Sequence, residues 1–332
     1  MGREQRSAGN ARRIASSGAF ETASEGGRMR AVYSMVGTTI AGGVILAAAL
    51  SACAASPVPA PPAAAPATIV APAEDNPAID IPPLPALDDD AARAEAARLA
   101  TLMRRDIPHF QPLSPADEAR WIGLARAQMA QSDVVVDRAQ LLMVVDRSPR
   151  VQRVCFVLAL PGTAPWQVLG GTRVSTGRTG RKFNYVTPTG VFINSPDRLG
   201  YRAQGTRNEN GIRGIGVRGM RVWDMGWQWA EKGWLPSREK GQIRLEIHAT
   251  DPDFLESRLG HPASEGCVRI PSALNVFMDR HGLLDVLYEQ AASYDGRFRA
   301  LLPRDRVPSP IAGDALVVVD SSFSEEKEAK RL

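Results

Sequence analysis

The stretch from residue 243 to residue 271 reads IRLEIHATDPDFLESRLGHPASEGCVRIP. Its first six residues alternate between apolar and polar side chains, which predicts a β-strand with one buried face. On such a strand Ile243, Leu245 and Ile247 would face the core, and His248 would face a cleft on the opposite side. The stretch therefore predicts a strand that ends in a histidine and is followed, after a connection, by Cys267.

Cys267 and His248 are the candidate nucleophile and base. A cysteine attacks as its thiolate, and an ordinary cysteine is only slightly ionised at neutral pH, so it needs a base within hydrogen-bond reach. Gly266 permits a tight turn beside the thiol, and the amides of Gly266 and Cys267 could stabilise an oxyanion. The pair alone is weak support for catalysis, because a free cysteine is usually a small buried apolar residue.

Short β-rich runs lie on both sides of this stretch and are broken by turn residues. We expect strands near residues 141–145, 151–160, 166–172, 191–193 and 283–288. A helix is expected from Ala273 to His281, with Ser272 as its N-cap and Gly282 as its terminator. The pattern predicts a mainly β fold, like a sandwich or a barrel, in which Cys155 is a core strand residue.

A short helical accessory segment is expected at residues 88–132. Its first helix runs through Arg105, with acidic residues at the start and arginines at the end, as the helix dipole favours. Its second helix begins at Ser114-Pro115, the N-cap and first helical residue. After the β-rich part, residues 290–332 are expected to form a C-terminal tail, in which residues 315–320 could be a strand.

Residues 1–52 are expected to be a leader, with Met29 as an alternative start. Residues 31–50 carry no charge and follow Arg28 and Arg30, which is the layout of a secretory signal. The segment ending at Cys53 resembles a bacterial lipoprotein box, which would make Cys53 the lipidation site. A retained transmembrane anchor, since about 20 apolar residues can span a bilayer, and ordinary cleavage remain alternatives. All three place the rest of the chain outside the cytoplasm.

Residues 53–87 are expected to be a linker. Residues 56–87 are almost entirely Pro, Ala, Val and Ile. This composition favours an extended polyproline II spacer.

The charge distribution argues against a nucleic-acid partner. The whole chain has 40 basic and 36 acidic residues, of which residues 1–52 hold six and three. The remainder, 34 against 33, is nearly neutral and lacks the basic surface that a phosphate backbone requires. Three cysteines are too few for a disulfide scaffold, and no motif with metal-ligand spacing is present, so we expect neither a metal nor a cofactor.

Several segments resemble the L,D-transpeptidase (YkuD-like) catalytic domain. His248, fifteen residues and then Ser264-Glu265-Gly266-Cys267-Val268-Arg269 resemble the catalytic signature of that family. Residues 174–178 (VSTGR) and 187–192 (TPTGVF) resemble its strand-and-turn pair, and residues 137–144 resemble its opening hairpin. The segments occur in family order, so the resemblance covers residues 133–289 as the catalytic domain.

The resemblance implies a cysteine acyltransferase of the bacterial cell envelope, on the periplasmic face. Its substrates would be peptidoglycan stem peptides, with Cys267 as nucleophile, His248 as base, and Ser264 and Gly266 in the catalytic turn. The products would be 3-3 cross-links or an amine acceptor joined to the stem. Alternatives are an L,D-carboxypeptidase or amidase that hydrolyses the same thioester, and a catalytically weak peptidoglycan-binding lipoprotein.

Four further residues are candidates for substrate binding. Glu265 occupies the position where the family usually has His. It could orient His248, bind a substrate amine or simply be solvated, and its charge would raise the pKa of Cys267. Arg269 could pair with a substrate carboxylate or form a structural ion pair. Trp223 and Trp227 lie in residues 196–242, which resemble the lid insertion of the family, and could stack on substrate or pin a glycine-rich loop.

Overall fold

The computed structural model describes residues 83–322. The expected leader, the lipidation candidate Cys53, residues 53–82 of the linker and the chain end from residue 323 lie outside the described residues. Within residues 83–322, no helix combines the length and the apolar character needed to cross a membrane.

Two helices open the described part, as the sequence predicts. Helix α1 spans Asp89–Asp106 and helix α2 spans Pro115–Met129. The Asp88 side chain accepts a hydrogen bond from the Ala91 amide, and the Ser114 hydroxyl accepts one from the Asp117 amide. Each cap satisfies an amide that the first turn of a helix leaves without an intrahelical partner.

Nine strands form two sheets in the described residues, which agrees with the expectation of a mainly β fold. The five-stranded sheet has the order β3-β2-β1-β9-β4. Its strands are β1 (Gln140–Asp146), β2 (Arg153–Ala159), β3 (Gln167–Arg173), β4 (Gly190–Ile193) and β9 (Ala315–Val319). The four-stranded sheet has the order β5-β6-β7-β8. Its strands are β5 (Tyr201–Arg202), β6 (Arg221–Glu231), β7 (Lys240–Ala249) and β8 (Val268–Ile270).

Strand β9 shows that the domain does not end at residue 289. It lies between β1, to which it is parallel, and β4, to which it is antiparallel, and all five of its residues are buried. A strand in this position completes the hydrogen bonding of two neighbours. The expected tail boundary is therefore wrong, because residues 315–319 belong to the core of the five-stranded sheet.

The region around residues 271–301 also differs from the expectation. Helix α3 spans Ser272–His281, but Ser272 is its first helical residue and the N-cap is Pro271. Gly282 does terminate the helix, in the left-handed conformation. The strand expected at residues 283–288 is wrong: helices α4 (Val286–Ala291) and α5 (Gly296–Leu301) follow instead. Their apolar residues, Tyr288 and Phe298 among them, form a small buried cluster of their own.

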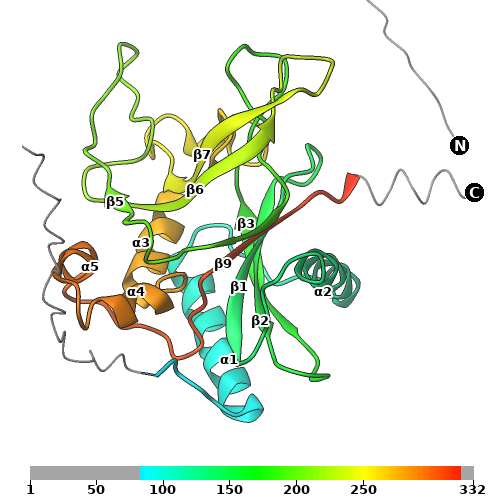
Figure 1. The fold of residues 1–332 in the computed structure, drawn as a ribbon, viewed down its shortest axis with the longest axis vertical. Helices are drawn as coiled ribbons and strands as arrows, with labels where there is room; N and C mark the ends of the chain where they lie inside the picture. Colours follow the sequence, from blue (N-terminus) through cyan, green and yellow to red (C-terminus); the bar gives the residue numbers. More distant parts are fainter. Residues whose placement is uncertain (1–82, 323–332) are drawn as a thin grey trace, which may run out of the picture. The chain divides into compact units, whose positions relative to one another are not determined.

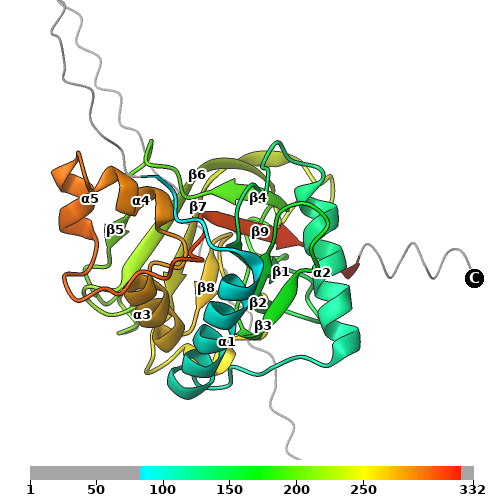
Figure 2. The same ribbon diagram turned by 90° about the horizontal axis from the view of Figure 1, so that it is seen from below.

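The two faces of the five-stranded sheet are covered by different elements. Helix α2 packs on one face, where Trp121 and Met129 meet Cys155, a buried free cysteine, and Val317. Helices α1 and α3 and the inner face of the four-stranded sheet share a second core with the opposite face. Figures 1 and 2 show α1 and α2 on opposite sides of the sheet. Cys155 is thus a core strand residue, as expected.

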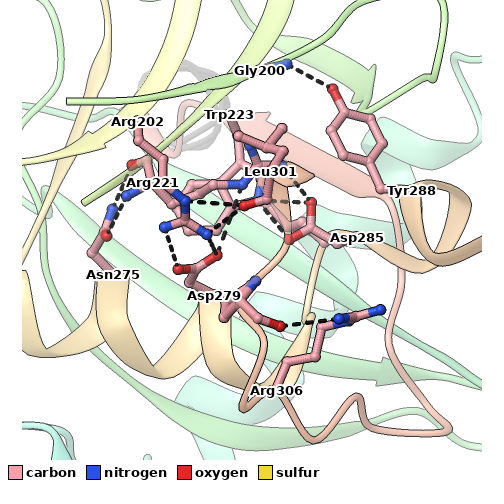
Figure 3. A network of polar contacts seen from close by, with 12 residues as sticks. Gly200, Arg202, Arg221, Trp223, Asn275, Asp279, Asp285, Tyr288, Leu301 and Arg306 are labelled. Atoms are coloured by element: carbon pink, nitrogen blue, oxygen red, sulfur yellow. Dashed lines mark hydrogen bonds and ion pairs between the residues drawn. The ribbon is translucent and has the colours of Figure 1, made fainter. Parts of the chain in front are cut away.

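A buried carboxylate joins these layers. Asp285, between α3 and α4, is fully buried and accepts hydrogen bonds from Asn194, Arg221 and Trp223. Asn194 directly follows β4, whereas Arg221 and Trp223 lie on β6, so one side chain links the end of β4 to the second sheet. Figure 3 shows Arg221, Trp223 and Asp285 in this network. The buried Arg221 guanidinium also lies against the rings of Trp223 and Tyr288, at 5.6 and 5.2 Å from the centroids.

Asp285→Ala should lower the free energy of unfolding by about 3–5 kcal/mol, because it leaves the buried Arg221 charge without its partner. Urea denaturation of the full chain measures this loss. Glu239→Ala is the control, since its partner Lys232 lies in an exposed ion pair that contributes little. Equal midpoints for Asp285→Ala and Glu239→Ala would contradict the role given to Asp285.

Candidate active site

Cys267 lies in a turn at the start of β8, against β7. Strand β8 is parallel to β7, with Ile247 opposite Val268 and His248 opposite Arg269. This register places Cys267 beside Glu246. The Cys267 thiol, which is partly exposed, donates a hydrogen bond to the Arg244 carbonyl over 3.7 Å. The sulfur therefore lies beside β7, just before the point where β8 begins to pair with it.

Ser264 fixes the shape of this turn. Its hydroxyl donates to the Cys267 carbonyl over 2.6 Å and accepts from the Gly266 amide over 3.1 Å. Ser264 is only 1% exposed, and both of these hydrogen bonds lie within the turn. The Gly266 amide, which we expect to help to stabilise an oxyanion, donates to Ser264 in this structure.

Gly266 contributes its backbone conformation. Its φ is +141°, in the region that favours glycine, and a Cβ there would lie 2.8 Å from the Ile243 side chain. A larger residue would be strained at this φ and would require the end of the Ile243 side chain to move. The sequence predicted a tight turn at Gly266, and this prediction is confirmed.

Two upstream segments hold the turn in place. The Thr187 hydroxyl donates to the Gly266 carbonyl over 2.7 Å and accepts from the Gly177 amide over 2.8 Å. The Asn184 side chain donates to the Ser264 carbonyl, and the Tyr185 amide donates to the Glu265 carbonyl. The segments that contain residues 174–178 and 187–192 therefore meet the cysteine turn directly.

Gly177 makes this approach possible. A Cβ on Gly177 would lie 1.9 Å from the Tyr185 carbonyl oxygen, which no side chain tolerates. The neighbouring Ser175 forms an isolated antiparallel bridge with Arg269, and Gly177 forms a parallel one with Ser264. Sequence reasoning identified the segments but did not assign roles to Asn184 or Thr187, since their partners are about 80 residues away along the chain.

His248 is buried, with only 4% of its surface exposed. Its Nδ1 lies 2.7 Å from the Ala249 carbonyl. A carbonyl only accepts, so Nδ1 carries the proton and Nε2 keeps a lone pair that can act as a base. Burial lowers the pKa of His248 to about 4, the nearby Arg269 charge adds to this fall, and the Ala249 hydrogen bond opposes it. The imidazole is therefore neutral at physiological pH.

The Cys267 thiol is also uncharged in this structure. Burial raises its pKa to about 12, and the Glu246 carboxylate adds to the rise. The Glu246 backbone amide and the Arg269 charge oppose it. In the described part of the chain no hydrogen bond joins the thiol to His248, because their partners are the Arg244 and Ala249 carbonyls. Cys267 lies beside Glu246, and Glu246 and His248 are two residues apart on β7. The thiol and the imidazole therefore lie on one face of the sheet.

Tyr201 and Glu246 belong to the same face and were not predicted as site residues. The Tyr201 hydroxyl donates to the Glu246 carboxylate over 3.0 Å. Burial raises the pKa of Glu246 and that of Tyr201. The alternation of residues 243–248 was the available signal for Glu246. Nothing in the sequence indicated that Tyr201, on a strand of two residues, would reach it.

The remaining predicted site residues divide into two groups. Glu265, exposed, and Arg269, half-buried, flank Cys267 and both influence its charge. Trp227 is 66% exposed and lies opposite Arg244, on the face that carries the thiol. Trp223 is fully buried and donates to Asp285, so the expectation that it contacts substrate is wrong.

Within residues 83–322, no three His, Cys, Asp or Glu side chains are grouped so that they could hold a metal ion.

The buried neutral His248 makes stability depend on pH. Its pKa is 6.5 as a free group and about 4 when folded, so the unfolded chain binds more protons between these values. The neutral His248 therefore contributes fully to the free energy of unfolding above pH 6.5, and this contribution is lost as the pH falls to 4. We expect the wild type to lose about 3 kcal/mol more than His248→Gln over this window, because each pKa unit corresponds to about 1.4 kcal/mol. Urea titrations at pH 7 and pH 4 measure it, and equal losses would refute it.

Thr187→Val should destabilise the chain by about 1–3 kcal/mol, because it leaves the Gly177 amide and the Gly266 carbonyl unpaired without changing the side-chain volume much. Thr187→Ser keeps the hydroxyl and should retain most of the stability. Chemical denaturation compares the two variants. If valine and serine behave alike, the hydroxyl does not clamp the turn.

Neither a protein-family model nor a curated protein sequence matches this chain. The function is therefore argued from the side chains that the fold brings together around Cys267.

Proposed function

We propose that the protein is a cysteine acyltransferase that acts on peptidoglycan stem peptides, with an L,D-transpeptidase-type fold. The observation that carries the proposal is the meeting of three separate segments at Cys267. Residues 174–178, residues 187–192 and the turn at 264–267 resemble the L,D-transpeptidase family in sequence. In the structure, hydrogen bonds through Thr187 and Ser264 join them around one partly exposed thiol.

The acylation step would run as a general-base reaction. As the Cys267 sulfur bonds to a substrate carbonyl carbon, the thiol proton passes to Nε2 of His248. The carbon–nitrogen bond of the substrate then breaks, the leaving amine takes the proton from His248, and a thioester remains. Concerted proton transfer suits this site, because the resting thiol and imidazole are both uncharged.

The second step would release the acyl group to an amine. The attacking nitrogen loses a proton to His248, the new carbon–nitrogen bond forms, and the carbon–sulfur bond breaks to regenerate the thiol. The exposed Trp227, on the face that carries Cys267, is available to stack on the donor or the acceptor. Water in place of the amine would make the enzyme an L,D-carboxypeptidase or an amidase.

One observation favours a second candidate, a catalytically weak peptidoglycan-binding protein. The pKa of Cys267 is raised to about 12, and Glu246 and Glu265 both oppose its ionisation. Under either candidate, the leader and Cys53 would place the domain at the periplasmic face of the envelope, through a lipid or an N-terminal helix.

Mass spectrometry of disaccharide-tetrapeptide incubated with the full chain tests the proposal. The expected product is a cross-linked dimer that has lost D-alanine, and Cys267→Ala should form none. His248→Gln should lower the rate by about 10²–10⁴-fold, the usual contribution of a general base. Thr101→Ala, on the exposed surface of α1, is the matched control and should keep the wild-type rate.

The other outcomes separate the alternatives. Shortened monomers without dimers would retain Cys267 as nucleophile and identify a hydrolase. No product from the wild type, together with binding of the peptide, would reject the enzyme and favour the binding protein.

A further inference from the structure

A polar cavity of about 520 Å³ lies beside the cysteine turn. Glu265 and Arg269, which flank Cys267 in the sequence, both line it. The rest of the wall comes from the loop after β3, the loop between β5 and β6, and the connection between β7 and β8. Its volume is that of an ordinary ligand site.

The wall of this cavity carries a strong excess of positive charge. Arg178, Arg181, Arg258 and Arg269 line it, and Glu265 is the one carboxylate among the lining residues. Within residues 83–322, none of the four guanidiniums forms an ion pair with an Asp or Glu side chain, in contrast to Arg202, Arg213 and Arg221. Burial lowers the pKa of Arg269, and the nearby Arg178 charge adds to this fall.

Three buried polar atoms around the cavity have no hydrogen-bond partner in the described part of the chain. They are Nε of Arg178, Nε of Arg269 and Oγ1 of Thr250. Thr250 is 1% exposed and lines the cavity. Arg269 uses one other nitrogen, which donates to the Ala263 carbonyl over 3.3 Å. Folding rarely leaves buried donors without partners, so these atoms point to a ligand that supplies acceptors.

From these observations we infer that the cavity is a subsite for a carboxylate of the acyl-donor peptide, held by Arg178 and Arg269 with Arg181 and Arg258 at its exposed rim. A guanidinium and a carboxylate match in geometry and can form two parallel hydrogen bonds. The Thr250 hydroxyl supplies a further donor. This inference rests on the proposed function for the source of the carboxylate, whereas the ligand chemistry rests on the cavity alone.

The subsite would also assist the thiol. The four guanidiniums exceed Glu265 and one bound carboxylate in charge, so the cavity wall keeps a positive charge after the ligand binds. Arg269 already favours the thiolate in the free protein. Arg269 therefore opposes the effect of the Glu246 carboxylate on the thiol.

Calorimetry with the full-length Cys267→Ala protein, which cannot turn over, tests this subsite. The probes are the disaccharide-tetrapeptide, the same compound with its carboxylates amidated, and glutarate as a free dicarboxylate. We expect amidation to weaken binding at least about tenfold, as the loss of one charge-assisted hydrogen bond does. Arg178→Ala should weaken binding of the acid form to the same extent and leave the amidated form unchanged.

Two further variants control the measurement. Arg178→Lys keeps the charge but not the paired donors and should lie between the wild type and Arg178→Ala. Arg104→Ala removes an arginine of α1 that does not line the cavity and should change nothing. Higher salt should weaken the acid form more than the amidated form.

Each outcome decides between the subsite and the proposed function. Equal affinity for the acid and amidated peptides, or discrimination that persists in Arg178→Ala, would overturn the subsite even if Cys267 is acylated. Glutarate binding that depends on Arg178, with no binding of the tetrapeptide, would support the carboxylate subsite and contradict the proposed function.

Discussion

The position of the Cys267 thiol depends on the turn at residues 264–267, whose polar groups are held by distant parts of the chain. Ser264 closes the turn from within, and Thr187 and Asn184 hold it from outside. The Thr187 and Asn184 contacts join this turn to the loop that leads into β4 of the first sheet. A small displacement of either sheet would therefore move the sulfur, so the stability of the fold and the geometry of the site are linked.

The electrostatics of the site follow from burial. The buried imidazole and the partly buried thiol both favour their neutral forms, and the carboxylate of Glu246 reinforces this at the sulfur. A preformed ion pair between Cys267 and His248 is therefore absent from the described structure. The arginine-lined cavity has the opposite effect on the thiol. Its positive charge, which includes Arg269, favours the thiolate. Under the proposed function, the free protein is protected from unwanted alkylation and the thiol ionises only during attack.

Local patterns in the sequence predicted those helices and strands whose positions depend on neighbouring residues. The alternation at residues 243–248 indicated β7 and its two faces, the acidic and basic ends indicated α1, and Ser114-Pro115 indicated the start of α2. The resemblance of residues 174–178 and 187–192 to one family indicated segments that do meet the cysteine turn. It gave no account of why they meet, because the Thr187 and Asn184 contacts depend on tertiary geometry.

The missed features all depend on long-range packing. The run at residues 286–291 contains strand-forming residues, but the cluster around Tyr288 and Phe298 stabilises helices there. Strand β9 was recognisable as an apolar run, yet its place between β1 and β4 depends on partners more than 100 residues away along the chain. Trp223 was a candidate for stacking on substrate or pinning a loop, but it lies in the core, where Asp285 accepts its indole N–H. The cavity arginines come from three separate segments, which no spacing in the sequence connects.

The intact mass of the full-length protein, quenched in acid during reaction with disaccharide-tetrapeptide, tests the central claim most directly. The account predicts a thioester adduct that maps to Cys267, has lost the terminal D-alanine, and forms more slowly in His248→Gln. A protein that binds the peptide but gains no mass, or that gains it at another residue, would contradict the claim.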